Sequence, residues 1–138
     1  MKALQQIKNF RTKDLRQVIF IKTTPNRVYD ALTIPKLHSR FTDSKAINTD
    51  KLGIFSAYDG YAFGENIQLI KNKKIVQTWA STDWPKGHYS QVTYEFKQEG
   101  NKTKVKFIQK DIPSSEFKGI KTGWKEFYWN PLKSFLEK

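Results

Sequence analysis

The chain has no cysteine among its 138 residues, which excludes thiolate catalysis, cysteine-ligated metals and disulfide bonds. Histidine occurs only as His38 and His88, and no Gly-x-Ser-x-Gly motif is present, so neither a serine triad nor a histidine metal site is indicated. No apolar run approaches the roughly 20 residues of a membrane-spanning helix. We therefore expect a soluble cytoplasmic protein that is not an enzyme and has no cofactor, bound metal or catalytic residue.

The two histidines and one pair of glycines are each interpreted as structural features. His38 lies in a polar stretch after Pro35, and we expect it to be structural or solvated. His88 ends the segment Trp84-Pro-Lys-Gly-His88, where an imidazole can hydrogen-bond the backbone and fix a turn. The glycine pair Gly60-x-x-x-Gly64 lacks the Lys-Ser/Thr of a phosphate-binding loop and predicts a turn and a bulge.

Acidic residues are scarce, with 13 Asp and Glu against 25 Lys and Arg, for a net charge of +12. The surplus lies in residues 1–51 and 101–138, whereas residues 52–100 are balanced. Such a charge attracts nucleic acid, an acidic protein surface or an anionic membrane. The phasing of the aromatic residues argues against nucleic acid, because most occupy core positions of strands or a helix rather than a stacking surface.

The remaining residues predict one domain of the α+β class. Residues 15–22 indicate a strand, Pro25 and Pro35 begin two short helices, and residues 53–109 alternate with the two-residue period of an antiparallel meander. Residues 1–14 carry a weak helical stripe and are interpreted as a basic N-terminal arm, with the domain at 15–138. The expected architecture is a curved antiparallel sheet of about six or seven strands wrapped on a long C-terminal helix.

The C-terminal helix carries a wide apolar stripe at about 100° per residue. Its members are Phe117, Ile120, Trp124, Phe127, Tyr128, Pro131 and Phe135. We expect this stripe to cover the sheet and the helix to bend at Pro131. Trp129, Leu132 and Leu136 form a second ridge. This ridge is either covered by the N-terminal arm or exposed as an interaction patch.

A second surface feature is the segment from Trp79 to Tyr89. It either closes the sheet over one end of the helix, or presents a rigid aromatic tip to a partner or gates a cavity. The sequence leaves these two interpretations open.

Three segments together resemble a known family. They are Trp79-x4-Trp84-Pro-Lys-Gly-His88-Tyr-Ser-Gln-Val-Thr-Tyr-Glu-Phe96, Asp111-Ile-Pro113 and Gly123-Trp124-Lys-Glu-Phe-Tyr128-Trp129-Asn-Pro-Leu132-Lys133. In this order and spacing they resemble the homologues of the activator of the 90-kDa heat-shock protein ATPase, across about residues 15–137, as a single-domain member. The resemblance implies the helix-grip fold shared with START domains and the birch-pollen allergen group.

The resemblance also implies a partner. In two-domain activators one domain anchors on the middle segment of heat shock protein 90, while the domain similar to this one contacts the ATP-binding domain. The implied contact residues are Trp84, Lys86, His88, Trp129 and Lys133, all expected to reach solvent. An alternative is a small hydrophobic ligand between sheet and helix, with Trp79, Tyr94, Phe107, Trp124 and Phe127 lining its cavity. A cavity larger than a few hundred cubic ångströms favours the ligand, and a filled interior favours the co-chaperone.

Overall fold

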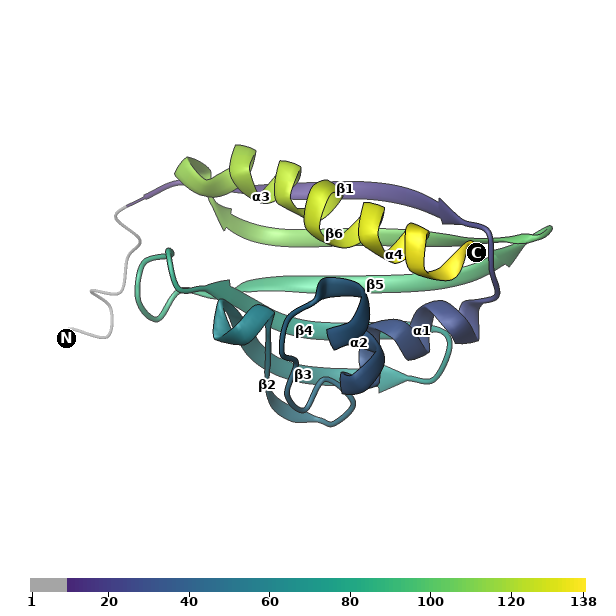
Figure 1. Ribbon diagram of the computed structural model, residues 1–138. Coiled ribbons are helices and arrows are strands. Elements are labelled where there is room, and N and C mark those ends of the chain that lie inside the picture. Colours follow the sequence, from purple (N-terminus) through teal and green to yellow (C-terminus); the bar gives the residue numbers. More distant parts are fainter. Residues whose placement is uncertain (1–9) are drawn as a thin grey trace.

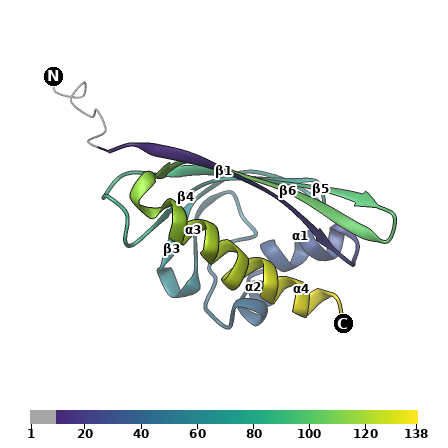
Figure 2. The same ribbon diagram turned by 90° about the horizontal axis from the view of Figure 1, so that it is seen from above.

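The computed structural model describes residues 10–138 and contains one six-stranded antiparallel sheet with strand order β1-β6-β5-β4-β3-β2. The sheet curves, and all helices lie on its concave side (Figures 1 and 2). The expected α+β helix-grip architecture is confirmed. The strands are β1 (Thr12–Ile21), β2 (Gly53–Ala57), β3 (Ala62–Ile70), β4 (Lys74–Ser81), β5 (Ser90–Glu99) and β6 (Lys102–Pro113).

Alternating burial in the central strands sets which side chains face the helices. From Ser90 to Phe96 in β5 and from Thr103 to Gln109 in β6 every second residue is buried. The register pairs Tyr94 with Phe107 and Val92 with Gln109. These side chains form the concave surface of the sheet, while the intervening lysines face outward.

The N-terminal strand begins earlier than the sequence indicates. β1 starts at Thr12 and pairs with β6, so residues 12–14 belong to the sheet and not to an arm. A bulge between Lys13 and Leu15 interrupts the pairing. Residues 1–9, the main part of the predicted arm, lie outside the described residues.

Two short helices follow β1 as expected, each opened by a proline whose missing N–H is tolerated in the first helical turn. They are α1 (Pro25–Thr33) and α2 (Pro35–Thr42). The expected turn occurs, since Gly60 has a φ of 92° in the 3-10 turn η2 (Tyr58–Gly60). The register shift between β3 and β4 lies between Asn66 and Gln68, beyond Gly64, the expected position of the bulge. At Gly64 a Cβ would collide with the Thr78 carbonyl, so only glycine fits there.

A long C-terminal helix crosses the concave face of the sheet (Figure 2). After the 3-10 turn η3 (Ser114–Glu116), it runs through α3 (Phe117–Gly123), the π-helical segment η4 (Trp124–Trp129) and α4 (Asn130–Leu136). Pro131 lies in the first turn of α4, directly after the π-helical segment.

The π-helical segment corrects the predicted face of this helix. Its i→i+5 hydrogen bonds turn the chain by less than 100° per residue, so residues five apart share a face. Trp124 and Trp129 accordingly stack with ring centroids 5.7 Å apart. Phe127, predicted to be in the apolar stripe, is instead 58% exposed, and the second ridge of Trp129, Leu132 and Leu136 is buried. The ridge belongs to the buried core, so the expectation of an exposed interaction patch is wrong. The alternative, a cover by the N-terminal arm, concerns mainly residues 1–9, which lie outside the described residues.

We predict that Trp124→Ala destabilises the fold by about 3–5 kcal/mol, because it removes a large side chain that is 3% exposed. Phe127→Ala, in the same helix, should change the free energy of unfolding by less than about 1 kcal/mol because its ring is mostly in solvent. Urea unfolding of both variants measures the difference. Equal destabilisation would contradict the π-helical assignment of the two faces.

Candidate functional site

A buried chain of hydrogen bonds fixes the C-terminal helix above the sheet. The Trp124 indole Nε1–H donates to Gln109 Oε1 at 2.7 Å, and Gln109 Nε2 donates to Ser90 Oγ at 3.0 Å. Ser90 Oγ in turn donates to the Trp79 carbonyl at 2.8 Å. The helix is thereby joined to β6, β5 and β4 through polar groups that are satisfied in the core.

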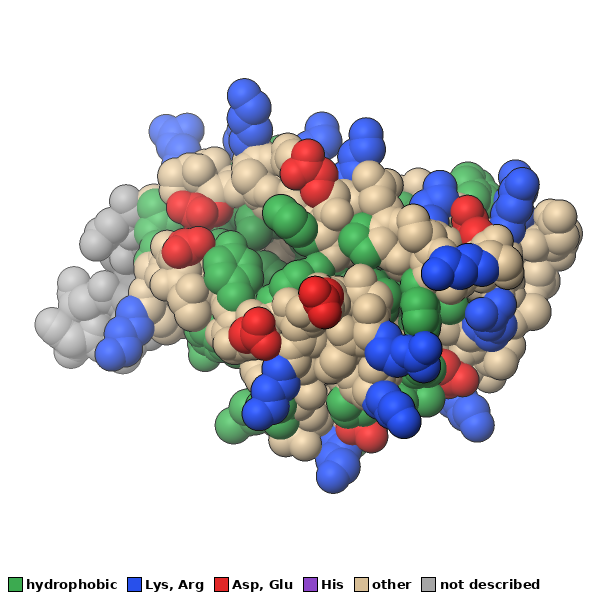
Figure 3. Space-filling view, in the orientation of Figure 1, with side chains coloured by type: hydrophobic (Ala, Val, Ile, Leu, Met, Phe, Trp, Pro, Cys, Tyr) green, Lys and Arg blue, Asp and Glu red, His purple; other side chains and the backbone are tan. Residues whose placement is uncertain are grey.

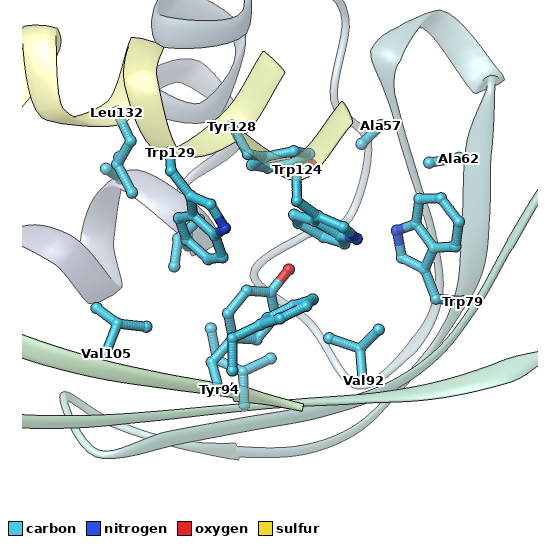
Figure 4. Close-up of a cluster of buried hydrophobic side chains, with 14 of the residues drawn as sticks. Ala57, Ala62, Trp79, Val92, Tyr94, Val105, Trp124, Tyr128, Trp129 and Leu132 are labelled. Atoms are coloured by element: carbon cyan, nitrogen blue, oxygen red, sulfur yellow. The ribbon is translucent and has the colours of Figure 1, made fainter. Parts of the chain in front are cut away.

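The space between helix and sheet is filled by aromatic side chains (Figure 4). Tyr94 and Phe107, expected to line a ligand cavity, pack on each other with centroids 5.4 Å apart, and Phe107 lies 4.5 Å from Trp124. A cavity of about 20 Å³ remains beside Tyr94, between helices and sheet. That volume suits about one water molecule, not an organic ligand.

His38 lies at this small cavity and is structural, as expected. Its side chain is 3% exposed, and Nε2 shares a hydrogen bond of 2.9 Å with the Tyr128 hydroxyl. Burial lowers the pKa of His38 to about 4, so the imidazole is neutral at pH 7.

An open cleft of about 580 Å³ lies on the surface between the C-terminal helix and the turn that joins β2 to β3. Figure 3 shows this hollow, with apolar side chains inside and acidic side chains around it. Three residues from the expected cavity lining are found here: Trp79, Trp124 and Phe127. The other lining residues are Ser44, Tyr58, Asp59, Tyr61, Ala62, Asp83, Glu116, Gly119, Ile120, Gly123 and Tyr128. We call it the acidic-rimmed cleft.

Tyr58 closes one end of the acidic-rimmed cleft. Its hydroxyl donates a hydrogen bond to the carbonyl of Phe127. The α-helical partner of that carbonyl would be residue 131, a proline with no N–H. Burial raises the pKa of Tyr58 to about 12, so the hydroxyl keeps its proton at neutral pH. Sequence reasoning missed Tyr58, although the Asp59-Gly60 turn signal beside it located the loop.

The segment from Trp79 to Tyr89 closes the sheet. Trp84, predicted to reach a partner, is buried with its ring 5.3 Å from Trp79. His88 Nε2–H donates to the Asp111 carbonyl at 2.8 Å, which confirms the expected backbone hydrogen bond. Lys86 is exposed at the tip of this loop.

The last two predicted contact residues lie on the C-terminal helix, Trp129 at the end of η4 and Lys133 in α4. Trp129 is also buried, and its Nε1–H donates to Gln17 Oε1 of β1 at 2.8 Å. Half-buried Lys133 lies at a surface groove of about 480 Å³, lined also by Gln17, Val18, Ile19, Phe20, Lys125, Trp129 and Asn130. We call it the basic groove. The loop with Lys86 and the helix α4 lie at opposite ends of the molecule (Figure 1), so the predicted contact residues form no single cluster.

Two features are absent from residues 10–138. No three His, Cys, Asp or Glu side chains lie close enough together there to bind a metal ion. Within the same residues, no helix has the length and apolarity to cross a membrane.

The sequence comparisons place the chain in a family. Residues 22–137 match the profile of the family described as activator of Hsp90 ATPase homolog 1-like protein, and the chain belongs to this family. Relatives include the activator of 90 kDa heat shock protein ATPase homolog of Dictyostelium discoideum, 36% identical over 88% of this chain and 32% of the relative. The human homolog 1 is 30% identical over 80% of this chain and 33% of the relative. The chain thus spans about a third of the length of these curated relatives.

Solved structures agree with the fold. An HSP90 activator from Plasmodium falciparum superimposes with a TM-score of 0.82 at 27% identity, covering 88% of this chain and 94% of that one. The Aha1 dimer from Colwellia psychrerythraea gives a TM-score of 0.76 at 21% identity, covering 91% and 96%. At that identity the second match supports the fold alone.

We predict that Tyr58→Phe lowers the free energy of unfolding by about 1 kcal/mol, because the Phe127 carbonyl loses its donor. Tyr89→Phe is the matched control, since no hydrogen bond of the Tyr89 hydroxyl is found within residues 10–138. Urea unfolding should separate the two variants, and equal stabilities would mean that the Tyr58 hydroxyl does not support the helix.

We also predict that His38 makes stability depend on pH. The pKa of His38 is about 4 in the folded state against an ordinary 6.5, so the unfolded chain binds the proton first as pH falls. The free energy of unfolding therefore keeps its full value above pH 6.5. It declines between pH 6.5 and 4, by up to about 3 kcal/mol, as the unfolded chain takes up the proton.

The check is the difference in unfolding free energy between the unaltered chain and His38→Gln, measured from pH 7.5 to 4.5. Glutamine can keep the hydrogen bond to Tyr128 but does not titrate. A constant difference across this range would refute a neutral, buried His38.

Proposed function

We propose that this chain binds heat shock protein 90 and stimulates its ATPase. The observation that carries the proposal is its membership of the activator family across residues 22–137. The filled interior supports it as well, because a space of about 20 Å³ between helix and sheet leaves the surface to perform the function.

The basic groove is the surface that best suits an acidic protein partner. Lys125 and Lys133 flank it, and β1 contributes Val18 and Phe20, which are 54% and 43% exposed. Exposed apolar side chains bordered by charge of one sign are typical of protein interfaces. Lys118 and Lys121 are exposed on the preceding helical segment and extend the positive charge.

Buried Trp84 and Trp129 then act indirectly. Trp129 ties the helix beside Lys133 to β1 through Gln17, and Trp84 packs beneath the loop that carries Lys86. Their role in binding is to hold the lysines on a rigid surface, which lowers the entropy lost when the partner docks.

Stimulation requires a difference in affinity between two states of the chaperone. A domain that binds the closed, ATP-competent arrangement more tightly than the open one shifts the population toward closure. The catalytic groups belong to the chaperone in this account, and this chain contributes binding energy only.

A second function is carried by the acidic-rimmed cleft. Its volume of about 580 Å³ falls in the range of small-molecule sites, and aromatic rings form its floor. We propose binding of a small apolar ligand there as an additional function, independent of the chaperone contact.

We predict that reversing Lys86 and Lys133 to Glu raises the concentration of this chain needed for half-maximal ATPase stimulation by about tenfold. Added salt should also raise the concentration of the unaltered chain needed for half-maximal stimulation, since charges are screened over about 10 Å at 0.1 M salt. The matched control is Lys97→Glu with Lys110→Glu, which makes the same change in net charge at exposed positions of β5 and β6. ATPase titrations that show equal effects for both pairs, or no salt dependence, would contradict the proposed surface.

Avidity offers a second test, because the curated relatives are longer than this chain. Fusing this chain to the remaining segment of a relative should lower the concentration needed for half-maximal ATPase stimulation. The decrease can reach a factor of about 10² to 10⁴ when both parts bind one chaperone molecule. Failure of both the chain and the fusion to stimulate the ATPase would overturn the proposal.

A further inference from the structure

The acidic-rimmed cleft has a charge opposite to that of the whole chain. The protein carries a net charge of +12, with 25 basic and 13 acidic residues. Of the side chains that line this cleft, three are acidic, Asp59, Asp83 and Glu116, and none is Lys, Arg or His. Within a strongly positive molecule this is a local negative field, and it surrounds an apolar hollow (Figure 3).

The three acidic side chains of the rim differ in their partners within the described residues. Asp59 Oδ1 already accepts the backbone N–H of Lys45 at 2.7 Å, which uses part of its capacity. Neither Asp83 nor Glu116 has an ion-pair partner within residues 10–138, where the single ion pair found joins Lys104 to Glu99. Burial raises the pKa of Tyr61, a hydrogen bond with Ser81 lowers it, and the charge and hydrogen bond of Asp83 and the charge of Glu116 raise it. Asp83 is therefore already partnered by Tyr61, and both carboxylates act on one wall of the cleft.

The floor of the cleft is aromatic. Trp79, Trp124 and Tyr128 line it, with Trp79 and Trp124 centroids 5.8 Å apart and Trp124 and Tyr128 4.6 Å apart. Figure 4 shows the indole of Trp79, on the sheet, beside that of Trp124, on the helix. The three floor side chains are only 3–6% exposed, so the aromatic surface open to a ligand is that of Tyr61 and Phe127, which are 42% and 58% exposed and also line the cleft. Aromatic faces attract cations through their quadrupole, and they also bury apolar surface.

Two glycines keep the cleft open along the helix. A Cβ at Gly119 would meet no atom within 4 Å, and one at Gly123 would meet only Phe127 Cδ2 at 3.8 Å. Glycine in a helix interior is less favourable than alanine by about 1 kcal/mol. Packing therefore does not demand glycine at either position, whereas an unobstructed cleft does.

We propose that the acidic-rimmed cleft binds a small organic cation, an apolar or aromatic body that carries a protonated amine. The body lies against the exposed rings of Tyr61 and Phe127, in the space left open by Gly119 and Gly123, and the amine lies at the rim between Asp83 and Glu116. This inference rests on the proposed ligand-binding function of the same cleft, and it adds the charge of the ligand.

The experiment compares three probes that share one ring system: 2-(2-naphthyl)ethylamine, 2-(2-naphthyl)ethanol and 2-naphthylacetate. Titration of the ¹⁵N-labelled chain by NMR gives an affinity for each probe and locates it. The amine should bind about tenfold more tightly than the alcohol, and the acid should bind most weakly. Raising the salt concentration should lower the affinity of the amine and leave the affinity of the alcohol unchanged.

Two sets of variants separate charge from space. The double variant Asp83→Asn with Glu116→Gln should reduce the amine's affinity to that of the alcohol, while Glu65→Gln, on exposed β3, should have no effect. Gly119→Leu should abolish binding of amine and alcohol alike without destabilising the fold, because leucine is the better helix former. Thr122→Leu, at an exposed helical position outside the cleft lining, is its control.

The outcomes distinguish the two proposals. Equal binding of amine and alcohol, abolished by Gly119→Leu, would overturn the cation inference and leave the ligand-binding function intact. Tighter binding of the acid would also overturn it. Binding of none of the three probes would overturn both.

Discussion

Two indole N–H groups hold the C-terminal helix on the sheet, and the other features of the molecule depend on them. Trp124 donates to Gln109 on β6, and Trp129 donates to Gln17 on β1. An indole buried without a partner would be unfavourable by about 1–3 kcal/mol, so each glutamine specifies one position and rotation of the helix. Both indoles can reach the sheet because five residues separate them in a π-helical segment.

This arrangement fills the interior and moves the functional surfaces outward. The stacked indoles, with Tyr94 and Phe107, occupy the space that a ligand would need between helix and sheet. The helix leaves a cleft on one flank, beside η2, and a groove on the other, beside β1. The cleft has an acidic rim and the groove is flanked by Lys125 and Lys133, so one helix separates two surfaces of opposite charge.

The sequence predicted the fold well because its signals are local. Two-residue alternation located the strands, Pro25 and Pro35 marked the two short helices, and the family motifs agreed with both. The faces of the last helix could not be predicted in the same way, since they depend on hydrogen bonding that changes from i→i+4 to i→i+5 within six residues. That change placed Phe127 at the surface and Trp129 in the core. The role of Tyr58 was hidden for a related reason, because its partner is a carbonyl 69 residues away.

We propose that this domain meets heat shock protein 90 through the basic groove, not through the acidic-rimmed cleft. Amide NMR of the ¹⁵N-labelled chain, titrated with the unlabelled ATP-binding domain of the chaperone, tests it most directly. The account predicts that resonances of β1 from Gln17 to Phe20, and of Lys125 and Lys133, shift or broaden, while those of Asp83, Glu116 and Gly119 do not. Changes confined to the cleft residues, or no changes at any concentration, would contradict it.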